Sequence, residues 1–311
     1  MNKLSTLLTV QLQRKHSVLT SSGSSALIVA LKAAGIPKGA EVIMPAICCP
    51  AVLVAIQFAG YIPVLSDVGL NDYCINSQLT SKEITDKTKA IVAVHAYGHY
   101  CQIDQLSKLA KANNLLLIED ACLAVGGTYK GMPLGSFGDI SIISFGYDKL
   151  VSVNYGGALL TNNDEYAQNA DKFIYENPFF NFDLTNGLDN RLLTLFAELP
   201  QAIYKRKENV LLCRELLDSA IVKKLPYHDD VIFWRYPILV KSNREQLINS
   251  AKQKGIVIPK HYLSLHHFYT GLYLENAELL SQRMINIFIR PDTPKKQLQI
   301  TTQFINEFAY D

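Results

Sequence analysis

The sequence predicts an α/β protein: a three-layer sandwich around a mostly parallel sheet, followed by a smaller C-terminal α+β domain. Short apolar runs alternate with amphipathic segments through the first half, as strands and helices do in layered folds. Residues 90–94 form a continuous apolar run, which is typical of a strand covered on both faces. After about Asn163 the pattern becomes helical. We expect a large domain at 1–190, connecting helices at 191–225 and a small domain at 226–311.

The expected strands are short apolar runs that end at residues which interrupt a strand. Pro45 follows the first run and Asp67 closes soon after the second. Interior strands of a parallel sheet read as apolar throughout because helices cover both faces. The strands of the large domain are expected at 41–44, 62–65, 90–94, 115–118, 140–143 and 157–160. A strand of the small domain is expected at 233–240.

The expected helices carry apolar residues at helical spacing. One at 51–59 stops at Gly60, a natural C-cap, and Leu106 and Leu109 share a face of another. Residues 192–218 contain long amphipathic stretches, but we expect Pro200 to interrupt any single helix there. Further helices are expected at 103–114, 164–175, 205–217, 244–254 and 276–285.

Composition excludes several classes of function. The chain has 311 residues, of which 49% are hydrophobic and 19% charged, so it has enough apolar surface for a substantial core. A net charge of +2 without a dense basic cluster gives no reason to expect nucleic-acid binding. The longest apolar runs are strand-length, so we expect no membrane span.

Cysteine usage and the first residues predict a cytoplasmic protein. Six cysteines show no CxxC spacing, and Met1 is not followed by a hydrophobic signal segment, so we expect reduced thiols. We expect no metal site, because His261, His266 and His267 have no cysteine pair near them in sequence.

Lys149 and Asp120 are the candidate catalytic residues. Asp120 ends an expected interior strand, at the edge where open α/β sheets bind ligands. Lys149 follows another strand in a loop that leads to Gly156 and Gly157. A lysine amine and a carboxylate suit pyridoxal phosphate, which bonds to a lysine and needs an acid at its ring nitrogen. Taken separately, Lys149 also fits a solvated surface lysine, and Asp120 also fits a strand-end aspartate that caps the next turn.

A serine- and glycine-rich turn is the candidate phosphate cradle. Ser22, Gly23, Ser24 and Ser25 precede an apolar helix, and amides at a helix start bind anions with the help of the helix dipole. N-capping alone is the plainer interpretation of such a cluster. Ser144 ends a strand near the lysine, and its hydroxyl is a further candidate phosphate ligand.

These motifs, taken in order, resemble the sugar aminotransferase family named DegT/DnrJ/EryC1/StrS, within the fold-type-I pyridoxal-phosphate enzymes. Ser144, Phe145 and Lys149 keep the family's Ser-Phe-x-x-x-Lys spacing. The other stretches similar to the family are 22–27, 41–46, 94–99, 118–122, 135–139, 156–157 and 255–266.

The resemblance implies an aspartate-aminotransferase-like large domain and a transaminase that moves an amino group from glutamate or glutamine to a keto-sugar, with a nucleotide-linked sugar as the favoured substrate. It places Lys149 and Asp120 at the cofactor and implies a homodimer with shared active sites. Cys49 stands where the family has a ring-stacking aromatic, and Leu123 where it has glutamine or histidine, so both are expected against the cofactor. Tyr97 and His95 are weaker candidates for the lining, and His261 and His266 for the substrate mouth.

Two alternatives stay open at this point. The same residues suit a sugar dehydratase or other carbanion chemistry. Leu123 and Tyr155 differ from the residues that the family usually has at these positions, and this leaves the reaction undecided. A catalytically weak binding or regulatory relative is the other alternative, which the lost stacking aromatic favours. Retention of Lys149, Asp120 and Ser144 argues against it.

Overall fold

The central sheet decides where the site lies. The computed structural model describes residues 2–184, 187–241, 243–260 and 262–308. The strands of the large sheet are β1 (His16–Thr20), β2 (Glu41–Pro45), β3 (Ile62–Ser66), β4 (Thr88–Val94), β5 (Leu116–Asp120), β8 (Ile140–Ser144) and β9 (Gly157–Thr161). Their order is β1-β9-β8-β5-β4-β2-β3. The run from β8 to β3 is parallel, and β9 is antiparallel to both of its neighbours. The sheet is therefore mostly parallel, as predicted.

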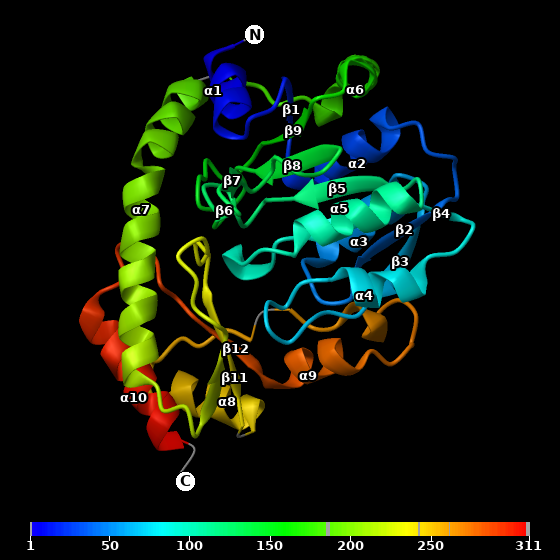
Figure 1. The fold of residues 1–311 in the computed structure, drawn as a ribbon. Coiled ribbons are helices and arrows are strands. Elements are labelled where there is room, and N and C mark those ends of the chain that lie inside the picture. The colour runs from blue at the N-terminus through cyan, green and yellow to red at the C-terminus, as the bar shows by residue number, and fades with distance from the viewer. Residues whose placement is uncertain (1, 185–186, 242, 261, 309–311) are drawn as a thin grey trace.

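Helices cover both faces of this sheet. The helices of the large domain are α1 (Lys3–Gln11), α2 (Gly23–Ala33), α3 (Pro50–Phe58), α4 (Ser77–Thr80), α5 (Ile103–Ala112) and α6 (Asp164–Glu176). Figure 1 shows α5 across one face and α2 and α3 on the other. Every residue of β5, β8 and β9 is buried, which explains why these strands read as continuous apolar runs.

The C-terminal part forms a second, smaller unit. Its sheet is antiparallel, in the order β10 (Val222–Lys224), β11 (Tyr236–Val240) and β12 (Met284–Ile287). Its helices are α8 (Arg244–Gln253), α9 (Glu275–Arg283) and α10 (Lys295–Phe308). Ile238, Leu247, Ile285 and Phe304 belong to a core separate from that of the large domain. The remaining short elements are β6 (Thr128–Tyr129), β7 (Met132–Pro133), η1 (Ser81–Glu83), η2 (Ala96–Gly98), η3 (Pro178–Phe180) and η5 (Leu265–His267).

One long helix joins the two units and corrects the expectation for Pro200. Helix α7 (Leu188–Leu216) runs for 29 residues with Pro200 inside it. It extends beside both domains in Figure 1. Phe196 is buried before the proline and Val210 after it, in the separate cores of the two domains. Packing at both ends offsets the local cost of proline, because tertiary contacts supply most helix stability.

Two element boundaries also differ from the sequence predictions. Residues 284–285, expected at the end of a helix, begin β12, where Met284 pairs with Leu239. The strand expected from Phe233 starts at Tyr236, because Phe233 has a φ of +52° and breaks the extended run. Among the described helices, none combines the length and apolar character that a membrane crossing requires.

Candidate active site

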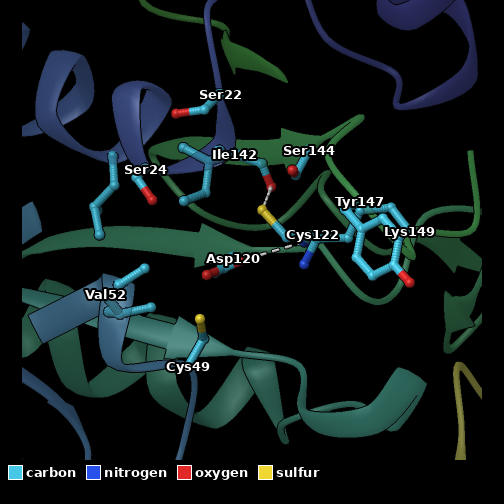
Figure 2. Close-up of a pocket in the computed structure, with 13 residues that line it drawn as sticks. Ser22, Ser24, Cys49, Val52, Asp120, Cys122, Ile142, Ser144, Tyr147 and Lys149 are labelled. Atoms are coloured by element: carbon cyan, nitrogen blue, oxygen red, sulfur yellow. Dashed lines mark hydrogen bonds between the residues drawn. The ribbon is translucent and has the colours of Figure 1, made fainter. Parts of the chain in front are cut away.

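A cavity of about 290 Å³ opens at the carboxyl ends of β5 and β8, against the start of α2. It brings Asp120 and Lys149 together with the serine-rich turn, although they are far apart in the chain. Figure 2 shows the acid on its strand, the lysine on the loop beyond β8 and Ser22 and Ser24 on the helix side. The other lining residues are Gly23, Leu27, Cys49, Ala51, Val52, Cys122, Ile142, Ser144 and Tyr147.

Asp120 presents one carboxylate oxygen to the cavity. The side chain is 6% exposed, and Oδ1 accepts a hydrogen bond from the amide of Cys122 at 2.9 Å. The Cys122 thiol also lies within reach of this carboxylate. A buried carboxylate anchored by one oxygen keeps the other as an acceptor for a ligand N–H.

Glu119, the acid next to Asp120 in the sequence, is part of a structural network and does not line the cavity. It is fully buried and accepts hydrogen bonds from the amides of Gly135, Phe137 and Gly138 at 2.6–2.9 Å. Its further contacts are His95 Nε2 at 3.0 Å and the buried Arg14 guanidinium at 3.9 Å. Burial alone would raise the pKa of Glu119, but the hydrogen bonds, that of His95 first, bring it below its usual value. His95 is thus part of this buried network and does not line the cavity.

The loop that carries Lys149 is held by the residue before it. Asp148 has a φ of +58°, and its carboxylate forms ion pairs with Arg235, at 2.6 Å, and with Arg290. Trp234 Nε1 donates to the backbone carbonyl of Asp148. Burial would raise the pKa of Asp148, but the two arginines, Arg235 first, lower it overall. Asp148 is thus a salt-bridge partner, and the small domain fixes the base of the lysine loop through it.

The serines of the turn before α2 form hydrogen bonds with one another. Ser22 caps α2 by accepting from the amide of Ser25 at 3.0 Å. The Ser25 hydroxyl lies 2.8 Å from Ser21 Oγ and 2.9 Å from Ser22 Oγ. Ser25 is therefore behind the cavity wall and shapes the turn, while Ser22, Gly23 and Ser24 line the cavity.

Close packing explains a glycine at position 23. A methyl group there would lie 2.9 Å from Ser144 Cβ and 3.1 Å from Cys122 Sγ. Only glycine lets the start of α2 approach the end of β8 this closely. Ser144 itself is 8% exposed, and its hydroxyl accepts from the amide of Gly146 at 3.2 Å.

A second, smaller hollow of about 30 Å³ adjoins the first and shares Asp120 and Lys149 with it. Leu123 and Cys49 lie in its wall, together with Tyr97 and Tyr262. Burial raises the pKa of Tyr97 and of Tyr262, so both stay protonated near neutral pH. The hollow is suited to a neutral or hydroxyl-bearing ligand.

Sequence reasoning missed several lining residues. Val52 and Ile142 gave no signal, because apolar residues are ordinary in cores, and Cys122 was marked only by its place in the family-like stretch 118–122. Tyr262 joins the site from the small domain, and the match of residues 255–266 to the family segment was its only signal. His261 lies outside the described residues, and His266 does not line either hollow.

The residues present fit pyridoxal phosphate. A helix start with serine hydroxyls provides anion-binding groups at one end of the cavity. The Asp120 oxygen described above can accept from a ring N–H, and Lys149 borders the same space. Within the described residues, no carboxylate pairs with the Lys149 ammonium at ion-pair distance, which leaves the amine available for a ligand.

The fold and the site together define a two-domain α/β enzyme of the aminotransferase type. The family model of the DegT/DnrJ/EryC1/StrS aminotransferase family matches residues 2–305, and the chain belongs to that family. A GDP-perosamine synthase of Escherichia coli O157:H7 is 30% identical over 324 residues, which are 96% of this chain and 86% of that protein.

Two further similarities extend the comparison. An L-glutamine:scyllo-inosose aminotransferase of Streptomyces griseus is 36% identical over 151 residues, covering 49% of this chain and 36% of that protein. The solved structure of NtdA from Bacillus subtilis, with the cofactor PMP bound, superimposes with a TM-score of 0.85 at 24% identity. That superposition covers 98% of this chain and 76% of the other, and it supports the fold.

Proposed function

We propose that this aminotransferase uses pyridoxal phosphate to move an amino group from glutamate or glutamine onto a keto-sugar, with a nucleotide-linked sugar as the favoured substrate. The observation that carries the proposal is the meeting of Lys149, Asp120 and the start of α2 in one cavity. The relatives described above act on a GDP-linked sugar and on a cyclic polyol, which supports the substrate class.

The chain's own residues divide the work. When bound, pyridoxal phosphate supplies an electron sink for the carbanion of the substrate. Lys149 borders both hollows, so its amine would carry a proton from the amino-bearing carbon of the donor to the cofactor. The Asp120 carboxylate would accept the hydrogen bond of the ring N–H and so keep that nitrogen protonated. Ser22 and Ser24, at the start of α2, would hold the phosphate.

The second hollow, of about 30 Å³, has room for one substituent of the sugar, such as a hydroxyl group, while the sugar ring needs the larger cavity. Tyr97 and Tyr262 line the second hollow, and Leu123 and Cys49 supply an apolar wall beside them. A sugar hydroxyl pairs with a phenol through a hydrogen bond. Leu123 adds no acid or base to this wall.

We also propose that the enzyme is a cytoplasmic homodimer. Tyr147 lines the cavity yet is 78% exposed. Phe179 is 83% exposed, and the next residue, Phe180, accepts a hydrogen bond from the amide of Ser21 beside the serine-rich turn. Large aromatic rings left at the rim of a site mark a surface that another protein covers. Light scattering of the purified protein should give twice the chain mass, and a monomer at working concentration contradicts this part of the proposal.

An absorbance titration tests the cofactor and the reaction separately. The protein with added pyridoxal phosphate should show a cofactor band that Lys149→Ala removes and that glutamate or glutamine bleaches. Asp120→Asn should keep the band and slow its bleaching by at least ~100-fold, because general acid–base and ring-nitrogen contacts contribute at this scale. A band that no amino donor bleaches indicates other carbanion chemistry, and no band at all excludes the cofactor. The substrate is then sought by screening nucleotide-linked keto-sugars against the aminated enzyme.

A further inference from the structure

A cluster of three metal-ligating side chains lies outside the catalytic cavity. His266, His267 and Glu278 each direct one ligand atom to a common point, and the three atoms lie within 4.8 Å of one another. The histidines belong to η5, and the glutamate belongs to α9, below α4 and β3 in Figure 1. From these contacts we infer that this protein has a divalent transition-metal site, of Zn²⁺ type, formed by His266, His267 and Glu278.

The distances suit a tetrahedral ion. Bonds of about 2.0–2.1 Å at tetrahedral angles place neighbouring ligand atoms about 3.3 Å apart. His266 Nε2 lies 3.4 Å from Glu278 Oε2, which already meets this value. His267 Nε2 lies 2.7 Å from the same oxygen and has to move outward by roughly 0.6 Å. Its side chain is 46% exposed and is free to make that adjustment.

The groups behind the ligands orient them as they do in metal sites. Ser264 Oγ lies 2.7 Å from His266 Nδ1, which fixes the ring and directs Nε2 at the carboxylate. Ser264 is fully buried, and its hydroxyl also reaches the carbonyl of Ala46 at 3.5 Å. On the other side, Gln282 donates to Glu278 Oε1 at 2.6 Å and leaves Oε2 facing both rings. Such outer contacts hold ligands in place and raise metal affinity.

Charge and ligand type select the ion. Two imidazole nitrogens and one carboxylate suit Zn²⁺, Co²⁺ or Ni²⁺ better than the oxygen-seeking Mg²⁺ or Ca²⁺. The nearby Asp67 adds a negative charge but is not a ligand, because its oxygens accept from the amides of Asn276 and Ala277 at the start of α9. Three protein ligands leave a fourth position for water.

The site would strengthen the junction between the domains. The Leu265 amide donates to the carbonyl of Ala46, at the end of β2, at 2.7 Å. A metal that joins η5 to α9 therefore ties the segment after Tyr262 to the edge of the large sheet. Because the ion binds only the folded cluster, it should raise the thermal stability of the protein.

Metal binding to the untagged, cofactor-loaded enzyme tests this inference directly. After treatment with a chelator and its removal, Co²⁺ is added and its visible ligand-field spectrum recorded, and Zn²⁺ is measured by calorimetry. We expect one ion per chain and a rise in melting temperature. His267→Ala and Glu278→Gln should weaken binding at least ~10-fold, and Ser264→Ala by ~10–100-fold. The matched control is His228→Ala, which removes an exposed histidine outside the cluster and should change nothing.

Several outcomes overturn the inference. These are the absence of saturable binding, equal binding by Glu278→Gln, and loss of binding in His228→Ala. His267→Ala alters an exposed side chain and should fold normally, so it remains informative if another variant does not fold. The readout is the ion itself, so a failure here leaves the aminotransferase proposal untouched.

Discussion

The ion pair between Asp148 and Arg235, here called the clamp, tests how the small domain holds the loop that carries Lys149. Asp148 and Arg235 are 13% and 12% exposed, and the Arg235 guanidinium packs between the rings of Trp234 and Phe288, 4.4 and 4.5 Å from their centroids. Asparagine also tolerates a positive φ, so Asp148→Asn removes the charge without straining the backbone.

The structure sets the size of the expected loss. Removing one partner of a buried pair costs about 3–5 kcal/mol, because the other charge stays buried and unpaired. The asparagine oxygen keeps one hydrogen bond, so we expect Asp148→Asn to lose about 2–3 kcal/mol of the free energy of unfolding. Arg290 is 45% exposed, and its pair with Asp148 should contribute only about 0–1 kcal/mol.

A double-mutant cycle in urea separates the two pairs. Arg235→Met keeps an apolar side chain between the rings, and Arg290→Met is the matched control. The coupling energy of Asp148 with Arg235 should exceed that with Arg290 by at least ~1 kcal/mol. Equal couplings would refute the view that burial makes the first pair the clamp. The lowered pKa of Asp148 also predicts how this contribution depends on pH. Asp148 stabilises the fold above its unfolded-state pKa, and this stabilisation is lost as the pH falls through its folded-state pKa.

Three further predictions follow from the contacts around the site. Gly23→Ala should weaken cofactor binding at least ~10-fold in a fluorescence titration, since its methyl group forces α2 away from Ser144; unchanged affinity contradicts the packing argument. Glu119→Gln should lower the free energy of unfolding by about 3 kcal/mol at pH 7. It should also flatten the acid limb of the curve of stability against pH, because the folded-state pKa of Glu119 is lowered and its stabilising contribution is lost as the pH falls through that pKa. An equally steep acid limb in the variant would mean that other carboxylates cause the loss of stability at low pH. His95→Gln, which replaces the imidazole in contact with Glu119, is the companion variant for the same measurement. Thiol alkylation followed by mass spectrometry should label the partly exposed Cys49 before the buried cysteines, and cofactor should protect it; labelling indifferent to cofactor removes Cys49 from the site.

The sequence predicted which polar residues border the cavity better than it predicted the apolar walls of the cavity. Lys149 and Asp120 stood out because each follows an apolar strand, and strand ends of a parallel sheet meet at one edge. Ser25 also matched the phosphate motif, yet its hydroxyl is turned toward Ser21 and Ser22. A motif fixes which residues are near a helix start, but the capping geometry decides which of them face the cavity.

Local pattern determined the α/β class, every strand of the large sheet except β1, and the positions of Asp120 and Lys149 after apolar runs, because period and polarity are properties of neighbouring residues. Contacts between distant segments were decided only by the tertiary structure. Pro200 lies inside α7 because both domains pack against that helix. Arg235 contacts Asp148, which lies 87 positions away in the sequence, and His266 of η5 contacts Glu278 of α9. Neither pair has a spacing that a sequence pattern would reveal. Such pairs depend on how the two domains dock, and docking depends on the packing of surfaces that no single segment contains.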